Sequence, residues 1–562
     1  MTNHPVHEII MVEFYLGVEI MKILLVEPGY KNKYPPMSLM KISTYHKSKG
    51  DFVAFEKGLN RSGVIWDRIY ITTLFTFHYR EVLKTIKHYK KYVKNKNDIF
   101  VGGIMASLLT EDLKKDSGLN NIIIGRLLNS SMLGFNDNVN IDVLPLDYDI
   151  LQGCEYKYPS GDNFFAYTTR GCVNKCPFCA VPILEGGLSI TNNIHEQISF
   201  ARDTYGDKRN LLLLDNNVLA LKNEDLQAIV NNITSLGFIK TPTFFKQSEF
   251  LKLSDAYFRA ANTKNDNSII SQKLKELLDN LRNSKKLSQK TQEKIAEKVI
   301  DIGTLYEDEV DMILSNLDFF IDVEKKYNYK KPMQRYVDFN QGMDARLLTE
   351  EKMKILSALP IKPFRIAYDN IKYTDIYTKA IKLAARYGVE EFSNYLLYNF
   401  DDKPIELYNR LKINIDLAAE LSVHIYSFPM KYEPIENKKR GYVGKNWNLY
   451  YLKSIKAILN VSKGVFSGDT SFFEKAFGKN EQEFLEILSM PKELITYRLF
   501  YENLNITSKW KKEYNALTAT QKNILLDALS NDSFDVADQK IQTILRFYKN
   551  SVINKKNNIL KI

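Results

Sequence analysis

Residues 164–179 read FFAYTTRGCVNKCPFC, an apolar run that leads directly into three cysteines spaced C-x3-C-x2-C. The apolar run, Phe164 to Thr169, predicts a β-strand, and the Gly and Pro residues after it predict a loop. Three thiolates this close in sequence can converge on one iron-sulfur cluster, and one iron would then lack a protein ligand. An iron with an open position can bind and activate a substrate, so this loop is the candidate reactive centre.

Zinc is the main competing interpretation of the cysteine loop, with Cys154 as a fourth thiolate. Structural zinc sites usually use two close pairs of ligands, whereas Cys154 lies eighteen residues before Cys172, across the predicted strand. Three buried structural cysteines are a further alternative, although such residues seldom cluster in a loop marked by Gly and Pro. Four cysteines in 562 residues are too few for a disulfide framework.

The strand before the cysteine loop opens a long alternation of strands and helices. Five more strands are predicted along the chain, at 211–214, 336–339, 364–368, 392–398 and 423–428. The clearest helices between them are 194–205, 375–387 and 404–421. Six strand–helix units are too few to close an eight-stranded barrel, so we expect a partial (β/α)6 barrel of parallel strands.

A shorter alternation precedes this one and gives the chain its α/β class. Strands are predicted at 22–27, 51–55, 68–74 and 98–103, separated by segments of helical length. This pattern predicts a Rossmann-like parallel sheet covered on both faces. Gly102 and Gly103 stand at the end of the last predicted strand, which fits either close approach of a ligand or a tight strand-to-helix turn.

The remaining regions read as helices and complete the predicted domain plan. An insertion at about 245–332 carries amphipathic helices at 270–282 and 289–302, and the end of the chain is helical in pattern. We therefore expect the following order: an N-terminal extension at 1–20, the Rossmann-like domain at 21–150, the partial barrel at 151–435 and an all-helical C-terminal domain at 436–562.

The composition is that of a folded protein, with 44% hydrophobic and 26% charged residues. The net charge of +11 permits an anionic partner such as nucleic acid, although no dense Lys/Arg block is present. No uncharged stretch of about 18 apolar residues occurs. Glu8, Glu13 and Glu19 lie where a signal peptide would be apolar. We therefore expect a cytoplasmic protein with no membrane partner.

Polar residues follow four successive predicted strands of the barrel, at the carboxyl ends where parallel α/β proteins bind ligands. Taken singly, each is as readily an N-cap or a turn residue, but their recurrence predicts a shared pocket. The candidates, in chain order, are Asp215, Asn217, Gln341, Asp344, Arg346, Asp369 and Asn399. His424, within the last predicted strand, is expected to be a core histidine rather than a catalyst.

The cysteine loop, with Phe178 before its last cysteine and at the end of the first of six strand–helix units, resembles that of the radical S-adenosylmethionine (SAM) enzymes. The resemblance covers roughly residues 160–435. It implies that Cys172, Cys176 and Cys179 hold a [4Fe-4S] cluster whose fourth iron chelates SAM. It further implies that an electron, supplied by a flavodoxin or ferredoxin, cleaves SAM to methionine and a 5′-deoxyadenosyl radical that attacks a substrate.

The same resemblance implies roles for the strand-end residues. Phe178 is expected beside the cofactor. Radical SAM enzymes commonly carry a Gly-Gly-Glu type motif after the second strand to receive the SAM amino group. This chain lacks those glycines, but Asp215 could accept the same hydrogen bonds. Arg346 could bind the SAM carboxylate through a bidentate fork. The other candidates are assigned to SAM, its ribose or the substrate: Asn217, Gln341, Asp344, Asp369 and Asn399.

Residues 21–145, placed before such a core, resemble the cobalamin-binding domain of cobalamin-dependent radical SAM enzymes, notably at 34–39 and 101–103. The region after the first strand, 27–31, lacks the D-x-H-x-x-G signature. Many radical SAM enzymes bind cobalamin without this signature, so the resemblance keeps cobalamin as one expectation. A domain used for docking or for shaping the substrate site is the alternative.

Three functions remain open on the sequence. The first is a radical SAM enzyme of unassigned substrate, with methyl or methylthio transfer as candidate reactions. The second is an RNA-modifying radical SAM enzyme, because residues 168–172 also look like the cluster loop of tRNA methylthiotransferases. The N-terminal domain of those enzymes carries three further cysteines, which are missing here. The third is a zinc-stabilised binding protein.

Overall fold

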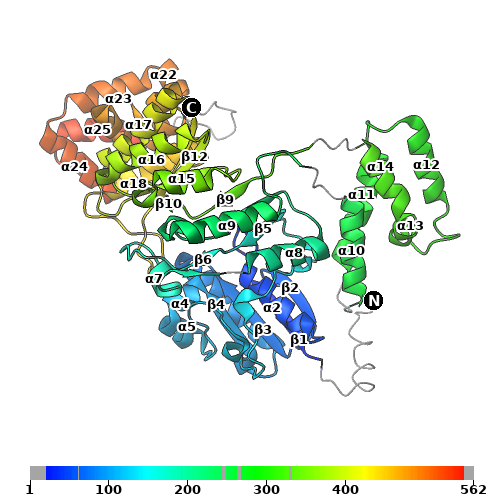
Figure 1. Cartoon of the computed structure of the whole chain (residues 1–562). Helices are drawn as coiled ribbons and strands as arrows, with labels where there is room; N and C mark the ends of the chain where they lie inside the picture. Colours follow the sequence, from blue (N-terminus) through cyan, green and yellow to red (C-terminus); the bar gives the residue numbers. More distant parts are fainter. Residues whose placement is uncertain are drawn as a thin grey trace.

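The computed structural model shows a mixed α/β protein with parallel sheets, which confirms the predicted fold class. The residues it describes are 20–60, 63–191, 193–243, 248–262, 267–327, 332–466 and 468–549. The predicted N-terminal extension thus lies almost wholly outside the described residues. Figure 1 shows the N-terminal sheet at the bottom, the C-terminal helices at the upper left and the inserted helices at the right.

The N-terminal sheet has four parallel strands in the order β2-β1-β3-β4. Its strands are β1 (Lys22–Glu27), β2 (Phe52–Lys57), β3 (Arg68–Thr73) and β4 (Ile99–Gly103). Its main helices are α2 (Met37–Ser48), α3 (Tyr79–Tyr89), α4 (Ile104–Leu108) and α5 (Thr110–Ser117). Alternate residues of β1 enter two different cores, with Ile23 and Leu25 in one and Leu24 and Val26 in the other. Both faces of the sheet are therefore buried, as the apolar runs predicted.

The second alternation forms six parallel strand positions in chain order, as predicted. They fall into two hydrogen-bonded sheets, β5-β8-β9 and β10-β11-β12-β13. The first comprises β5 (Asn163–Ala166), β8 (Asn210–Leu213) and β9 (Val337–Phe339). The second comprises β10 (Met343–Asp344), β11 (Phe364–Ala367), β12 (Glu391–Tyr398) and β13 (His424–Lys431). Residues 340–342 separate β9 from β10, so the third strand position is divided between the two sheets. We call these strands together the barrel strands, after the partial barrel that the sequence predicts.

The main helices that connect these strands are α8 (Ile194–Tyr205), α9 (Asn223–Ser235), α15 (Glu350–Leu356), α16 (Thr374–Arg386) and α17 (Pro404–Leu421). Three of them, α8, α16 and α17, follow the predicted bounds closely. The Thr349 side chain accepts a hydrogen bond from the Lys352 N–H and so caps the start of α15. His424 is exposed at the first residue of β13, so its assignment to the core was wrong. An apolar sequence context does not place the first residue of a strand inside the protein.

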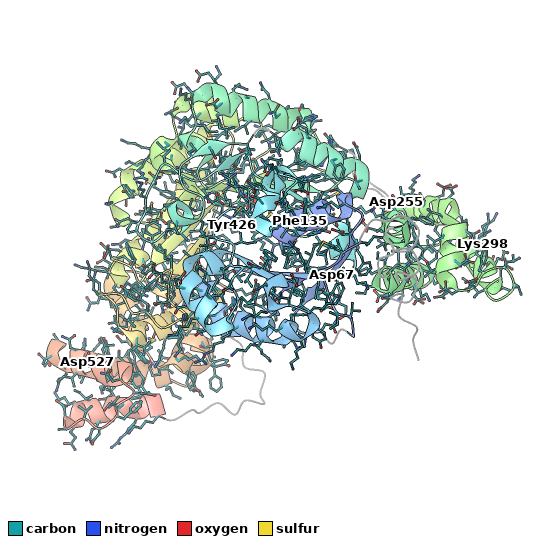
Figure 2. All side chains as sticks on the ribbon, turned by 90° about the horizontal axis from the view of Figure 1, so that it is seen from below. Asp67, Phe135, Asp255, Lys298, Tyr426 and Asp527 are labelled. Atoms are coloured by element: carbon teal, nitrogen blue, oxygen red, sulfur yellow. The ribbon has the colours of Figure 1, made fainter. Side chains whose placement is uncertain are left out.

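The inserted helices pack around a core of their own. They are α10 (Glu249–Asn262), α11 (Ser268–Arg282), α12 (Gln289–Ile300), α13 (Glu309–Ser315) and α14 (Leu317–Tyr327). Leu274 and the stacked rings of Phe250 and Phe320 lie in this separate core. Figure 2 shows that the insertion, marked by Asp255 and Lys298, projects from a different side of the molecule than Asp527 of the C-terminal helices.

The C-terminal region is helical, as expected, and shares its core with the barrel strands. Its longest helices are α18 (Leu449–Val461), α23 (Ile506–Asn515), α24 (Ala519–Ser530) and α25 (Gln539–Lys549). Trp510 is fully buried among them. Within the described residues, no helix combines the length and the apolar character needed to cross a membrane.

Candidate functional site

The cysteine loop projects from a small antiparallel hairpin that the sequence did not reveal. Its strands, β6 (Thr169–Arg170) and β7 (Ser189–Ile190), close the chain before and after the loop. Gly171 has a φ of +72°, and a Cβ at this position would lie 2.1 Å from the carbonyl oxygen of Gly187. Only glycine fits at this position, directly before Cys172, because the two arms of the hairpin approach each other closely there.

An ion-pair network clamps the two ends of the loop. Glu185, just after the short helix α7 (Val181–Leu184), accepts hydrogen bonds from the Gly171 N–H at 2.8 Å and the Asn216 amide at 3.0 Å. The Arg170 guanidinium donates to Glu185 at 3.1 Å and to Asp142 at 2.9 Å. Asp142 belongs to the segment before the barrel strands, so the clamp also ties the loop to the N-terminal part of the chain. Sequence reasoning missed this network because its partners are far apart in the chain.

The three thiols of the loop are free and partly buried. Burial raises the pKa of Cys176 and of Cys179, and the charges of Asp369 and of the other loop cysteines raise both further. The Asn174 N–H points at the Cys172 sulfur at 3.4 Å, and the Asn217 amide lies 3.9 Å from it. The loop therefore gathers three thiols, and the Cys172 sulfur has two hydrogen-bond donors nearby.

The thiols are not arranged for a single metal ion. Among the described residues, no three His, Cys, Asp or Glu side chains come together in a way that could hold one ion. Cys154 has different neighbours, Lys57 and Lys273, and lines a cavity beside the insertion. The structure does not bring it into the cysteine loop.

Asp215 follows β8 and is almost fully buried. Its Oδ1 accepts hydrogen bonds from the backbone N–H and hydroxyl groups of both Thr168 and Thr169. These bonds explain why the first strand breaks after Ala166 instead of running on to Thr169. Its Oδ2 has no hydrogen-bond partner among the described residues, and burial raises the pKa of the carboxyl group. An orphaned, buried carboxylate oxygen thus lies beside the cysteine loop.

The candidates after the third strand form a second polar group. Arg346 binds Asp344 through two hydrogen bonds of 2.8 and 2.6 Å, and Asn174 of the cysteine loop donates to Asp344 at 2.9 Å. The Asn217 carbonyl oxygen accepts weakly from the Asp344 N–H at 3.5 Å. Gln341 is exposed. The Arg346 fork, expected to receive a carboxylate, is occupied by Asp344 in this structure.

Asp369 and Phe400, which follow the fourth and fifth strands, both lie near the cysteine loop. Burial raises the pKa of Asp369 to about 6, and its charge acts on Cys176 and Cys179, so it lies near the loop. Phe178 makes an edge contact with Phe400 at 5.7 Å between ring centroids, which places the loop against the end of β12.

Asn399 requires a correction, because all of its polar atoms are bound within the chain. Its side chain is fully buried and donates to the carbonyl oxygens of Tyr432 and Tyr442, while its own oxygen accepts from the Gly444 N–H at 2.8 Å. Asn399 therefore anchors the loop after β13 and does not line an open pocket. Recurrence of polar residues at strand ends could not distinguish this role from ligand binding.

The strand ends of the N-terminal sheet are filled by the chain itself. The buried Glu27 pairs with Lys57 at 2.9 Å and accepts hydrogen bonds from the Tyr158 hydroxyl and the Asn32 amide. A Cβ on Gly103, whose φ is +103°, would lie 2.2 Å from the Thr73 carbonyl oxygen. The glycine pair therefore serves a tight turn between strand and helix.

Tyr34, one of the residues that carried the cobalamin resemblance, donates its hydroxyl to Asn340 at 2.9 Å. Asn340 lies directly after β9. This part of the resemblance thus connects the N-terminal sheet to the barrel strands.

Comparison with known proteins gives only distant likenesses. No family model matches the sequence, and no curated protein matches it. Among solved structures, two of the radical S-adenosylmethionine methyltransferase TsrM from Kitasatospora setae are similar. One, with cobalamin and a [4Fe-4S] cluster bound, is 10% identical, with 74% of this chain and 77% of that chain covered and a TM-score of 0.41. The other, with tryptophan substrate and the SAM analogue aza-SAM bound, is 10% identical, with 74% and 75% covered and a TM-score of 0.38.

Proposed function

We propose that the chain is a radical SAM enzyme in which Cys172, Cys176 and Cys179 hold a [4Fe-4S] cluster and the fourth iron binds SAM. The observation that supports this most is the pairing of a clamped three-thiol loop with the orphaned Oδ2 of Asp215 at the same strand ends. When bound and reduced, such a cluster would supply the electron that cleaves SAM.

The residues present fit both groups. Three free thiols, with Cys154 elsewhere, match a cluster that keeps one iron open. The Asp215 Oδ2 would accept a hydrogen bond from the SAM ammonium group, and this would relieve the cost of burying an unpartnered carboxylate oxygen. The Asn217 amide would donate toward the Cys172 sulfur, the kind of outer contact that orients a metal ligand.

The neighbouring residues would shape the rest of the SAM site. Phe178 and Phe400 would cover the loop and limit access of water. Asp369, close to the cysteines, would hold its carboxyl group toward the bound SAM or substrate. Arg346 would receive the SAM carboxylate only by exchanging its present partner, Asp344.

Cobalamin in the N-terminal domain, methyl or methylthio transfer, and reduction by a flavodoxin or ferredoxin remain parts of this proposal. Cobalamin that co-purifies would show its absorption spectrum. An RNA substrate is the second candidate, motivated by the net charge of +11. It requires binding that weakens steeply with salt, so binding that does not change between low and moderate salt would discard it.

The decisive experiment is anaerobic reconstitution with iron and sulfide, followed by reduction and addition of SAM. We expect a brown protein with the electron paramagnetic resonance signal of a reduced [4Fe-4S] cluster, and 5′-deoxyadenosine detected by mass spectrometry. A colourless protein that holds one zinc and no iron would instead support the zinc-stabilised binding protein. Incubation with candidate substrates would then identify the product that carries transferred atoms.

A further inference from the structure

A large cavity lies at the other end of the barrel strands. Its volume is about 790 Å³, and its walls come from residues 148–162, which we call the linker segment, from the end of α8, and from α10 and α11. Asp162 and Lys208 lie in these walls and come just before β5 and β8, respectively. The cavity is therefore at the amino ends of the strands, whereas the cysteine loop follows their carboxyl ends. Figure 1 shows α10 beside α8 on this side of the molecule.

Several charged side chains in the cavity wall are paired with one another. Arg259 of α10 binds Asp149 of the linker segment through two hydrogen bonds of 2.7 and 3.0 Å. Lys252 lies 3.5 Å from Glu249 and 3.8 Å from Asp162. These pairs also attach the insertion to the linker segment. The carboxylates nearest to Lys208, the remaining buried cation, are therefore already bound to Arg259 and Lys252.

Lys208 is 6% exposed. Its ammonium nitrogen lies 4.2 Å from the ring centroid of Tyr148 and makes no hydrogen bond or ion pair with any residue the structure describes. Burial and the nearby charge of Lys252 lower the pKa of Lys208 to about 8, against the opposing effect of the Asp162, Glu249 and Asp149 charges. Lys208 is a largely buried lysine whose ammonium group contacts no counter-charge among the described residues, so a negative charge delivered to this position would be favoured.

The remaining walls suit the apolar part of a ligand. Leu253 and Ala256 of α10 and Leu277 of α11 line the cavity opposite the linker segment. Lys273 lies farther along the wall, where its ammonium group donates to the Gln152 carbonyl oxygen at 2.6 Å. A largely buried cation without an ion pair, within a partly apolar wall, is the pattern of a site for an amphipathic anion.

We propose that this cavity binds a small organic anion, a carboxylate or a phosphate monoester, whose charged group pairs with Lys208 and whose apolar body packs against α10 and α11. This gives the helical insertion a function, because its first two helices form one side of the site. The proposal does not depend on the radical SAM assignment, since no wall of the cavity comes from the cysteine loop.

The first experiment measures binding of anilinonaphthalenesulfonate, an aromatic anion whose fluorescence rises in apolar sites, to the anaerobically purified full chain. We expect one saturable site, with displacement by octanoate and by octyl phosphate; the stronger competitor identifies the anionic group. Lys208→Met should weaken binding about tenfold or more, as loss of a buried charged hydrogen bond predicts. Lys208→Arg should retain most of the affinity. Lys157→Met, an exposed lysine of the same wall, should change it less than about twofold.

A second readout needs no change at Lys208. Cys154 is in the cavity wall and is buried, so a bound anion should slow its alkylation by iodoacetamide, measured by peptide mass spectrometry. Lys208→Met should also leave the thermal unfolding midpoint unchanged or raised, because it removes an unpaired buried charge. Equal effects of the Lys208 and Lys157 variants, or no protection of Cys154 by any of the anions, would overturn the proposal. A lowered midpoint with unchanged probe binding would assign Lys208 a purely structural role and overturn it as well.

Discussion

The two parallel strand systems of this chain treat their carboxyl ends differently. In the N-terminal sheet, Glu27 and Lys57 pair at the strand ends, and Tyr158 closes over them. At the barrel strands, three thiols are free and the Asp215 Oδ2 has no partner among the described residues. Both systems have the topology that brings ligands to strand ends. Topology therefore indicates where a site can form, whereas polar atoms without a partner indicate where a site is still open.

The largest effect is expected from removing a loop thiol. Cys172→Ala, Cys176→Ala or Cys179→Ala should abolish both cluster assembly and SAM cleavage, because two thiolates cannot hold the cluster in place. Iron content, the electron paramagnetic resonance signal and 5′-deoxyadenosine formation measure this. Cys154→Ala is the matched control and should keep the cluster. Loss of the cluster in that control would mean that the ligands are wrongly assigned.

A large effect on stability, but not on chemistry, is expected at the closed strand ends. Glu27→Gln leaves Lys57 buried without its counter-charge and should lower the free energy of unfolding by about 3–5 kcal/mol. Urea denaturation measures this loss. Glu111→Gln, in an exposed pair with Lys114, should change stability by less than about 1 kcal/mol. If the folded Glu27 variant lost SAM cleavage specifically, the N-terminal sheet would have a direct part in that reaction.

Asp215→Asn tests the open strand end. The amide can keep its oxygen toward Thr168 and Thr169, but it places an N–H donor where Oδ2 now lies. SAM binding should weaken about tenfold to a hundredfold, the value of one charge-assisted hydrogen bond, while the cluster still assembles. Isothermal titration with SAM measures the affinity, and the exposed Asp203→Asn on α8 is the control. Unchanged affinity would remove Asp215 from the SAM site.

The smallest effect is expected at the clamp. Glu185→Gln weakens the contact with Arg170 and places an amide near the Gly171 N–H, which should cost about 1–3 kcal/mol of local stability. The cluster should form but be lost several-fold faster to an iron chelator, followed by the decay of its absorbance. Decay at the wild-type rate would show that the hairpin alone holds the loop.

Local sequence patterns predicted the secondary structure well. The bounds of α8 and α17 agree with the structure residue for residue, because amphipathic periodicity and the buried face of a helix are local properties. The cysteine loop was identified for the same reason. The β6–β7 hairpin was missed because it pairs residues about twenty positions apart, and no pattern within either short strand predicts that pairing.

The candidate site shows where residue type alone does not decide a role. Asp215 and Asn399 both follow strands and are both buried. Asp215 keeps one side-chain oxygen without a partner among the described residues, whereas both polar atoms of the Asn399 side chain bind the loop after β13. The two cases differ only in which distant backbone groups reach the side chain, and that information is absent from the local sequence.

The α/β alternation, the six strand positions and the three-thiol loop follow from local sequence patterns, since each depends on residues close together in the chain. The closed strand ends, the free polar atoms and the cavity that the insertion forms around Lys208 became visible only in the folded structure. These features depend on contacts between segments that lie far apart in the chain. The physical reason is that burial raises the free-energy cost of each polar group that has no hydrogen-bond partner.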